Sequence, residues 1–136
     1  MSLKWLNRDL IVSPYSFALC LSEKQFKKEL KRLNLPSEQW PPFLATPHAS
    51  ATVHFFERHG DIDFCAIVCL GDTSEIELEQ VYSMLVHEAV HIWQEIRAHI
   101  GERDPSSEFE AYSIQALSQQ LMFSYKEQTA AKEVKK

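Results

Sequence analysis

Hydrophobic residues recur at helical spacing in three stretches of the chain, and each stretch begins with a helix-start signal. Residues 22–25 and 74–77 both match the capping box, in which a serine is followed three residues later by Gln or Glu. In the third stretch, Asp104 is a favourable N-cap followed by proline, and Gly101 is expected to end the stretch before it. The three predicted helices cover about residues 23–34, 75–100 and 105–125.

Other stretches have the residue types of strands. Residues 51–57 and 62–70 are rich in β-branched and aromatic side chains, and residues 58–61 (Arg-His-Gly-Asp) between them predict a hairpin turn. Residues 10–21 also look extended, although Pro14 favours an edge or irregular strand. Residues 36–48, between the first predicted helix and these strands, are rich in proline. They predict a surface loop that is anchored by its aromatic side chains, Trp40 and Phe43.

The order of these elements is strand, helix, hairpin and two helices, which is typical of the α+β class. A length of 136 residues, 45% of them hydrophobic and 24% charged, suits one globular domain. We therefore expect a single domain over residues 1–136, with its core at about 10–125 and a frayed C-terminal tail over 126–136.

The charge balance excludes some partners. Lys and Arg number 14 and Asp and Glu number 19, so the net charge is −5 and we expect no nucleic-acid partner. No apolar run approaches the roughly 18 residues of a membrane span, and the N-terminus lacks the apolar stretch of a secretory signal. The cysteines Cys20, Cys65 and Cys69 include no Cys-x-x-Cys pair. They are predicted to be small buried hydrophobes in a reduced, cytoplasmic protein.

One face of the first predicted helix is basic. It is either a solvated face balanced by Glu23 and Glu29 or a small contact surface for anions. Its basic residues are Lys24, Lys27, Lys28, Lys31 and Arg32.

The motif that carries chemistry is His87-Glu88-Ala89-Val90-His91, in the long predicted helix. Side chains four residues apart lie one turn apart on the same face, so both imidazoles can reach one metal ion. Glu88 lies about 100° round the helix, where its carboxylate can reach a water at the metal without being a ligand. This is the zincin signature, in which the Glu acts as general base.

The residues around the motif predict a central, largely buried helix. Apolar side chains occupy most of its circumference, and the polar side chains share one narrow sector. That sector is either a metal site or the solvent face of an amphipathic helix. It consists of His87, Glu88, His91, Gln94 and Glu95.

A catalytic zinc needs a third protein ligand and an open position. The metzincin arrangement would place that ligand six residues after His91, where Arg97 cannot ligate a metal. His99 points away from His91 and is expected to be a helix-end residue. Glu95 shares the face but lies a further turn along, so we expect it to form hydrogen bonds or salt bridges beside the site.

A better candidate for the third ligand is the segment Glu-Phe-Glu-Ala at the start of the last predicted helix. Together with the histidine motif, it resembles the gluzincin clan of zinc metallopeptidases, whose third ligand lies in a Glu-x-x-(Ala/Ser)-Asp pattern on the next helix. The resemblance implies His87, His91 and Glu108 as zinc ligands, with Glu110 as the alternative to Glu108. Tyr112 stands where the family has an Asp that orients a ligand histidine, and it could donate a hydrogen bond instead.

Across about residues 51–125, the chain is similar to the minimal members of this clan, the minigluzincins, and to small uncharacterised zincin-like proteins of phage and prophage origin. The resemblance implies a single zincin-like domain: a short antiparallel sheet packed on the active-site helix, and a C-terminal helix that bears the third ligand. In the family, an edge strand binds an extended peptide by strand addition. Residues 51–57 or 62–70 would provide that strand.

The implied activity is zinc-dependent hydrolysis of peptide bonds, with one Zn²⁺ per chain, water at its fourth position and Glu88 as general base. The alternative is a non-catalytic, zinc-stabilised binding or assembly protein on the same fold. Glu88 favours the enzyme, because a structural zinc site does not need a general base. Candidates for stabilising the oxyanion are Tyr112, Tyr125, His48, His54 and His59.

Overall fold

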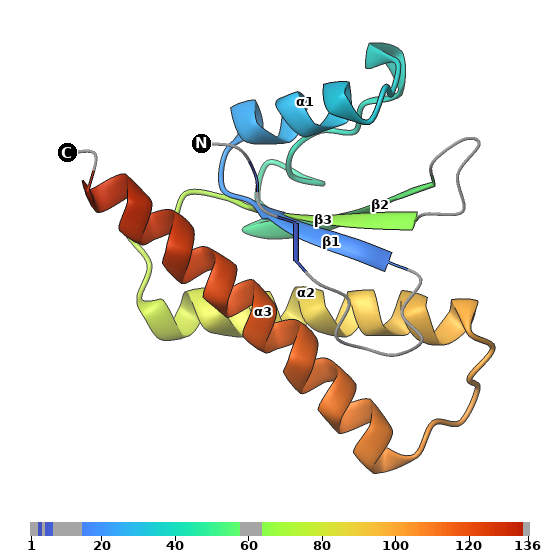
Figure 1. The fold of residues 1–136 in the computed structure, drawn as a ribbon. Helices are drawn as coiled ribbons and strands as arrows, with labels where there is room; N and C mark the ends of the chain where they lie inside the picture. Colours follow the sequence, from blue (N-terminus) through green and yellow to red (C-terminus); the bar gives the residue numbers. More distant parts are fainter. Residues whose placement is uncertain (1–2, 4, 7–14, 58–63, 135–136) are drawn as a thin grey trace.

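Three strands form a mixed sheet with helices on both of its faces (Figure 1). The structure, a computed structural model, describes residues 3, 5–6, 15–57 and 64–134. Its elements form a single compact α+β domain, in agreement with the predicted class. The strands are β1 (Tyr15–Cys20), β2 (Ala51–Glu57) and β3 (Phe64–Leu70), and the helices are α1 (Glu23–Arg32), α2 (Leu78–His99) and α3 (Ser107–Val134), with a 3-10 turn at Ser37–Gln39.

The strand order is β1-β3-β2, with β3 in the centre. β2 and β3 pair antiparallel, from Ala51 opposite Leu70 to Glu57 opposite Phe64, so the predicted hairpin pairing is confirmed. Its turn, at 58–61, lies outside the described residues, as do residues 10–14. β1 runs parallel to β3, so the expectation of an antiparallel sheet is wrong.

The parallel pairing follows from the path of the chain between β1 and β2. Parallel strands cannot be joined by a tight turn and need a long crossover. The segment from α1 to the end of the proline-rich loop carries the chain past the central position to the far edge, where β2 runs antiparallel. β3 then returns through the hairpin into the gap and runs in the direction of β1.

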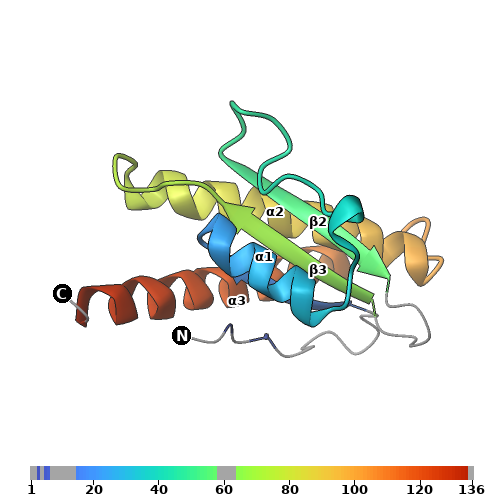
Figure 2. The ribbon, with the colours of Figure 1, turned by 90° about the horizontal axis from the view of Figure 1, so that it is seen from above.

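The central strand is buried from both sides. α1 covers one face of the sheet, whereas α2 and α3 cover the other (Figures 1 and 2). Because side chains alternate along a strand, Ala66, Val68 and Leu70 join the core under α2 and α3, whereas Ile67 and Cys69 join the core under α1. All five side chains are fully buried, which explains why this stretch of β3 contains no polar residue.

The cysteines behave as predicted, because Cys20, Cys65 and Cys69 are all buried and none of the three is in a disulfide. Burial, with a smaller contribution from the nearby Glu29 carboxylate, raises the pKa of the Cys20 thiol to about 12. A thiol that stays protonated at neutral pH is a poor nucleophile and metal ligand. The cysteines therefore contribute to packing.

Hydrogen bonds hold the start of α1 and the loop that follows it. Ser22 caps α1 as predicted, since its Oγ accepts the Gln25 N–H at 3.1 Å. The Gln25 side chain does not return to Ser22, and its Oε1 instead accepts the Leu21 N–H at 2.8 Å. In the loop after α1, Trp40 Nε1 donates to the Leu35 carbonyl at 2.8 Å, which confirms that an aromatic side chain anchors the loop.

The start of α2 differs from the prediction, whereas its end agrees. Glu77, not Ser74, is the N-cap, because Glu77 and Gln80 form a reciprocal capping box and α2 begins at Leu78. At the other end, Gly101 has a φ of +71°, and its N–H bonds back to the last turn of α2. This Schellman-type reversal turns the chain towards α3.

The third helix starts later and ends later than predicted. Its first turn is capped by Ser106, whose Oγ accepts the Phe109 N–H at 3.2 Å, so the prediction of Asp104 as N-cap is wrong. The helix continues to Val134, so the prediction of a frayed tail is wrong for residues 126–134. Within the described residues, no helix combines the length and the apolar character needed to cross a membrane.

The long C-terminal half of α3 is stabilised by packing against the sheet. Gln128 Nε2 donates to the Leu19 carbonyl in β1 at 2.9 Å, and Leu121 is fully buried in the core. The sequence predicts an end at about residue 125 because apolar residues become sparse after it. The last turns of α3 are stabilised instead by the hydrogen bond to β1, a contact that exists only in the folded domain.

We expect Leu121→Ala to lower the free energy of unfolding by about 2–5 kcal/mol, because it leaves a cavity in a close-packed core. The matched control is Leu78→Ala, since Leu78 is 51% exposed, and it should change stability by less than about 0.5 kcal/mol. Urea unfolding followed by circular dichroism measures both. Equal effects of the two variants would contradict the packing of α3 described above.

Candidate metal centre

α2 points its polar sector at the edge of the sheet because its apolar face is fully committed to the core. Six apolar side chains of the helix are at most 1% exposed, whereas Tyr82, Val86 and Val90 are only partly buried; the six are Val81, Leu85, Ala89, Ile92, Trp93 and Ile96. The helix packs beside β2, and the five polar residues of the predicted sector all line a hollow there. The orientation of the motif therefore follows from helical periodicity and from the core alone.

The two histidines of the motif converge. His87 and His91 lie one turn apart on α2, and their Nε2 atoms are 3.1 Å apart. Two nitrogen ligands at zinc-bond length in a tetrahedral arrangement are about 3.3 Å apart. Both imidazoles are exposed to the hollow, so a metal ion could approach them.

Gln94 orients the second histidine. Its Oε1 lies 3.2 Å from His91 Nδ1, and an amide oxygen only accepts hydrogen bonds, so Nδ1 donates. In a neutral imidazole this leaves the lone pair on Nε2, which faces His87. Metal-binding histidines in proteins are typically held in this way through the other ring nitrogen.

Glu88 is the only one of the five sector residues that is buried. Its side chain is 5% exposed, and the backbone N–H of Val53 in β2 donates to its carboxylate. Burial raises the pKa of Glu88 above its usual value, although the two histidines and the Val53 hydrogen bond act in the opposite direction. A solvent-facing helix side would leave this carboxylate exposed, so its burial favours the interpretation of the sector as a site.

The hollow itself has a volume of about 370 Å³. One wall is the polar sector of α2, and the other consists of residues of β2, including Ala51, Val53 and Phe55, with Ala45 at its end. The sequence predicted two candidates for the edge strand of the site, and the structure distinguishes them. Residues 51–57 form the edge strand β2, whereas β3 is central.

The structure does not bring Glu108 to the two histidines. α3 starts on another side of α2: Phe109 packs edge-to-face on Trp93 at a centroid distance of 5.3 Å, and Trp93 Nε1 donates to Glu110 at 2.9 Å. Trp93 follows His91 by two residues, so it lies about 160° away round the helix. Tyr112 is 65% exposed on α3 and does not line the hollow.

No group of three or more His, Cys, Asp or Glu side chains in metal-binding proximity occurs among the described residues. Glu95 lines the hollow beside His91 without completing such a group, and among the described residues its side chain forms none of the hydrogen bonds or salt bridges that the sequence led us to expect. Of the two carboxylates in the first turn of α3, Glu110 is committed to Trp93. Glu108 is exposed, and its carboxylate has no hydrogen bond or ion pair with any described residue. Glu108 as third ligand therefore stays a prediction.

The other histidine and tyrosine candidates have contacts elsewhere. His54 bonds to the Phe43 carbonyl at 3.1 Å and stacks on Phe26, and Tyr125 bonds to Thr73 at 3.0 Å. His99 stacks on Tyr15 at the end of α2, as expected of a helix-end residue. His48 is exposed in the loop before β2, and His59 lies outside the described part of the chain.

Sequence reasoning missed two contributors to the site. The sequence puts Gln94 in the polar sector, and its spacing of three residues from His91 is the signal for a hydrogen bond on one helix face that our prediction did not use. The Val53 N–H carries no sequence signal, because a backbone group is the same in every residue. Only the packing of α2 beside an unpaired strand edge reveals it.

The imidazoles of His87 and His91 and the carboxylate of Glu88 fit zinc, because two converging imidazoles and a nearby carboxylate are typical of catalytic zinc sites. The comparisons do not add to this. No protein-family model, no curated protein and no solved structure matches the chain. The resemblance to gluzincins therefore stays a prediction from the sequence.

We expect about one zinc per chain in protein purified without added metal. His91→Ala should lose it, because one imidazole and one carboxylate are too few ligands to hold zinc at trace free concentrations. Elemental mass spectrometry measures the stoichiometry. His48→Ala is the matched control, since it removes an exposed histidine outside the hollow. Full zinc occupancy in His91→Ala would exclude this residue as a ligand.

Substitution of Glu108 and of Glu110 should affect different properties, namely zinc binding for Glu108 and protein stability for Glu110. Glu108→Ala is expected to weaken zinc binding at least about tenfold without changing the stability of the metal-free protein. Glu110→Ala should leave zinc binding intact but destabilise the metal-free protein by about 1–3 kcal/mol, because it leaves the Trp93 N–H without its partner. Zinc binding that is unaffected by Glu108→Ala but lost in Glu95→Ala would place the third ligand on α2.

Proposed function

We propose that this protein is a small zinc-dependent metallopeptidase with a zincin-like fold of the gluzincin type. The observation that carries the proposal is the convergence of His87 and His91 Nε2, 3.1 Å apart, in a hollow that also holds the buried carboxylate of Glu88. His87 and His91, with Glu108 as the proposed third ligand, would hold the metal. When bound there, zinc would supply a Lewis acid that polarises a carbonyl and makes water more acidic.

Glu88 would act as general base and then as general acid. Its carboxylate accepts a proton from the attacking water and passes it to the leaving amine. Two features suit it to this work: burial brings its pKa closer to neutrality, and the Val53 hydrogen bond holds its position. His91 is oriented for its role by Gln94, which accepts the Nδ1 proton.

The substrate we propose is an extended peptide added to the free edge of β2. The Val53 N–H is directed at Glu88, away from β3. Residues two apart on a strand turn their backbone groups to the same edge, so Ala51 and Phe55 present theirs on this side as well. Both line the hollow, and a peptide paired with them would run past the two histidines.

Glu88→Gln tests the general base directly. The amide keeps the size of the side chain but cannot accept the proton, so hydrolysis of a quenched fluorescent peptide library should fall by at least about 100-fold. Zinc content and the thermal midpoint should stay close to those of the wild type. Glu79→Gln is the control, since it makes the same charge change at an exposed position of α2 and should retain activity.

Two results would overturn the proposal. Full hydrolysis by Glu88→Gln would remove the general base. A wild-type protein that holds one zinc, loses stability on chelation and cleaves nothing in the library would favour the alternative, a zinc-stabilised binding or assembly protein.

A further inference from the structure

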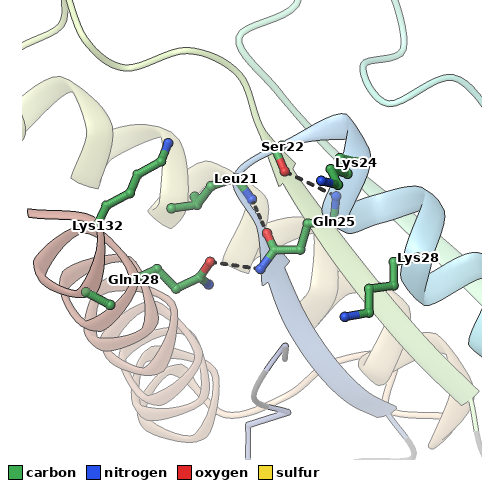
Figure 3. Close-up of a pocket in the computed structure, with 8 residues that line it drawn as sticks. Leu21, Ser22, Lys24, Gln25, Lys28, Gln128 and Lys132 are labelled. Carbon is green, nitrogen blue, oxygen red and sulfur yellow. Dashed lines mark hydrogen bonds between the residues drawn. The ribbon is translucent and has the colours of Figure 1, made fainter. Parts of the chain in front are cut away.

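A second hollow, of about 420 Å³, lies between the turn from β1 to α1 and the last turns of α3 (Figure 3). Three lysines border it: Lys24 and Lys28 from α1 and Lys132 from α3. Leu21 and Ala131 give it an apolar part. It shares no residue with the hollow beside β2.

The floor of this hollow is held by hydrogen bonds. Gln25 Nε2 donates to Gln128 Oε1 at 3.1 Å, and Gln128 Nε2 donates to the Leu19 carbonyl at 2.9 Å. Gln25 Oε1 in turn accepts the Leu21 N–H. This chain of contacts fixes α1 against α3, and in Figure 3 Lys28 and Lys132 flank the bond between the two glutamines. The lysines therefore come from two elements whose separation is set.

Within the part of the chain that the structure describes, no acidic residue lines this hollow and none of its three lysines forms an ion pair. The pKa of Asp72 is lowered mainly by hydrogen bonds with Ser74, and Lys132 is close enough to lower it further. Three lysines without an ion-pair partner among the described residues, in a chain of net charge −5, favour the binding of an anion there.

The basic face predicted for α1 is thereby divided in two. Lys27 pairs with Glu23 at 3.1 Å and Arg32 with Glu29 at 2.9 Å, as a solvated, balanced face requires. Lys24 and Lys28 are not part of that balance and border the hollow instead. The two interpretations left open by the sequence thus apply to different residues of one helix.

We infer that this hollow binds a small phosphorylated molecule. Lysine ammonium groups bind phosphate as point charges, and a phosphate monoester or diphosphate carries the two or more negative charges that three lysines match. The volume exceeds that of a bare ion and lies within the range of small-molecule sites. The lysines would hold the phosphate, while Leu21 and Ala131 would contact the remainder of the ligand.

The test is calorimetric titration with inorganic pyrophosphate at low ionic strength. We expect saturable binding with a Kd below about 1 mM. Lys28→Gln combined with Lys132→Gln should weaken it about tenfold, because each charge contributes a fraction of that factor. The matched control combines Lys31→Gln and Lys126→Gln, one exposed lysine from α1 and one from α3 outside the hollow, and should stay within about twofold of the wild type.

Pyrophosphate also binds metal ions, so the titration is repeated in His91→Ala, where binding should persist unchanged. Loss of binding there would assign it to the metal centre and overturn the inference. Equal weakening by the two lysine pairs, or no binding up to about 10 mM, would overturn it as well. Sedimentation with phosphatidylcholine vesicles, with and without phosphatidate, separates a free ligand from a lipid headgroup. Capture that depends on phosphatidate and on Lys28 and Lys132 would assign the phosphate to a lipid headgroup, whereas no capture would assign it to a soluble ligand.

Discussion

The fold depends on the burial of β3 from both sides. A strand with apolar residues on both faces needs a layer above it and a layer below it, and this chain supplies α1 for one and the α2–α3 pair for the other. β2 is then left at the edge, with α2 beside it. The candidate metal centre lies where these two elements meet, so the position of Glu88 against the Val53 N–H is a consequence of how β3 is covered.

Much of the fold could be predicted because it is local. Helical spacing located three helices, although only the predicted N-cap of α1 was correct, and residue types located the β2–β3 hairpin. The parallel pairing of β1 could not be read in this way, because a strand's neighbour is set by the path of the whole chain. The length of α3 escaped for a similar reason: Gln128 holds the last turns to Leu19, more than a hundred residues earlier in the chain.

In the candidate site, too, the local features could be predicted and the long-range ones could not. His87, Glu88 and His91 lie within five residues of one helix, so their relative positions follow from helical geometry alone. The third ligand would come from a different helix, and its position depends on how α3 packs on α2. In the structure the first turn of α3 uses Phe109 and Glu110 to pack on Trp93. The local sequence around Glu108 could not predict that α3 packs on the Trp93 side of α2.

The length of α3 has a mechanical consequence. Its 28 residues form a rod about 42 Å long, so a tilt of about 10° at one end displaces the other by about 7 Å. Trp93 holds one end of the rod, and Leu19 and Gln25 hold the other. If α3 moved as a rigid body, a tilt that carried Glu108 toward the histidines would therefore also displace Lys132 at its other end.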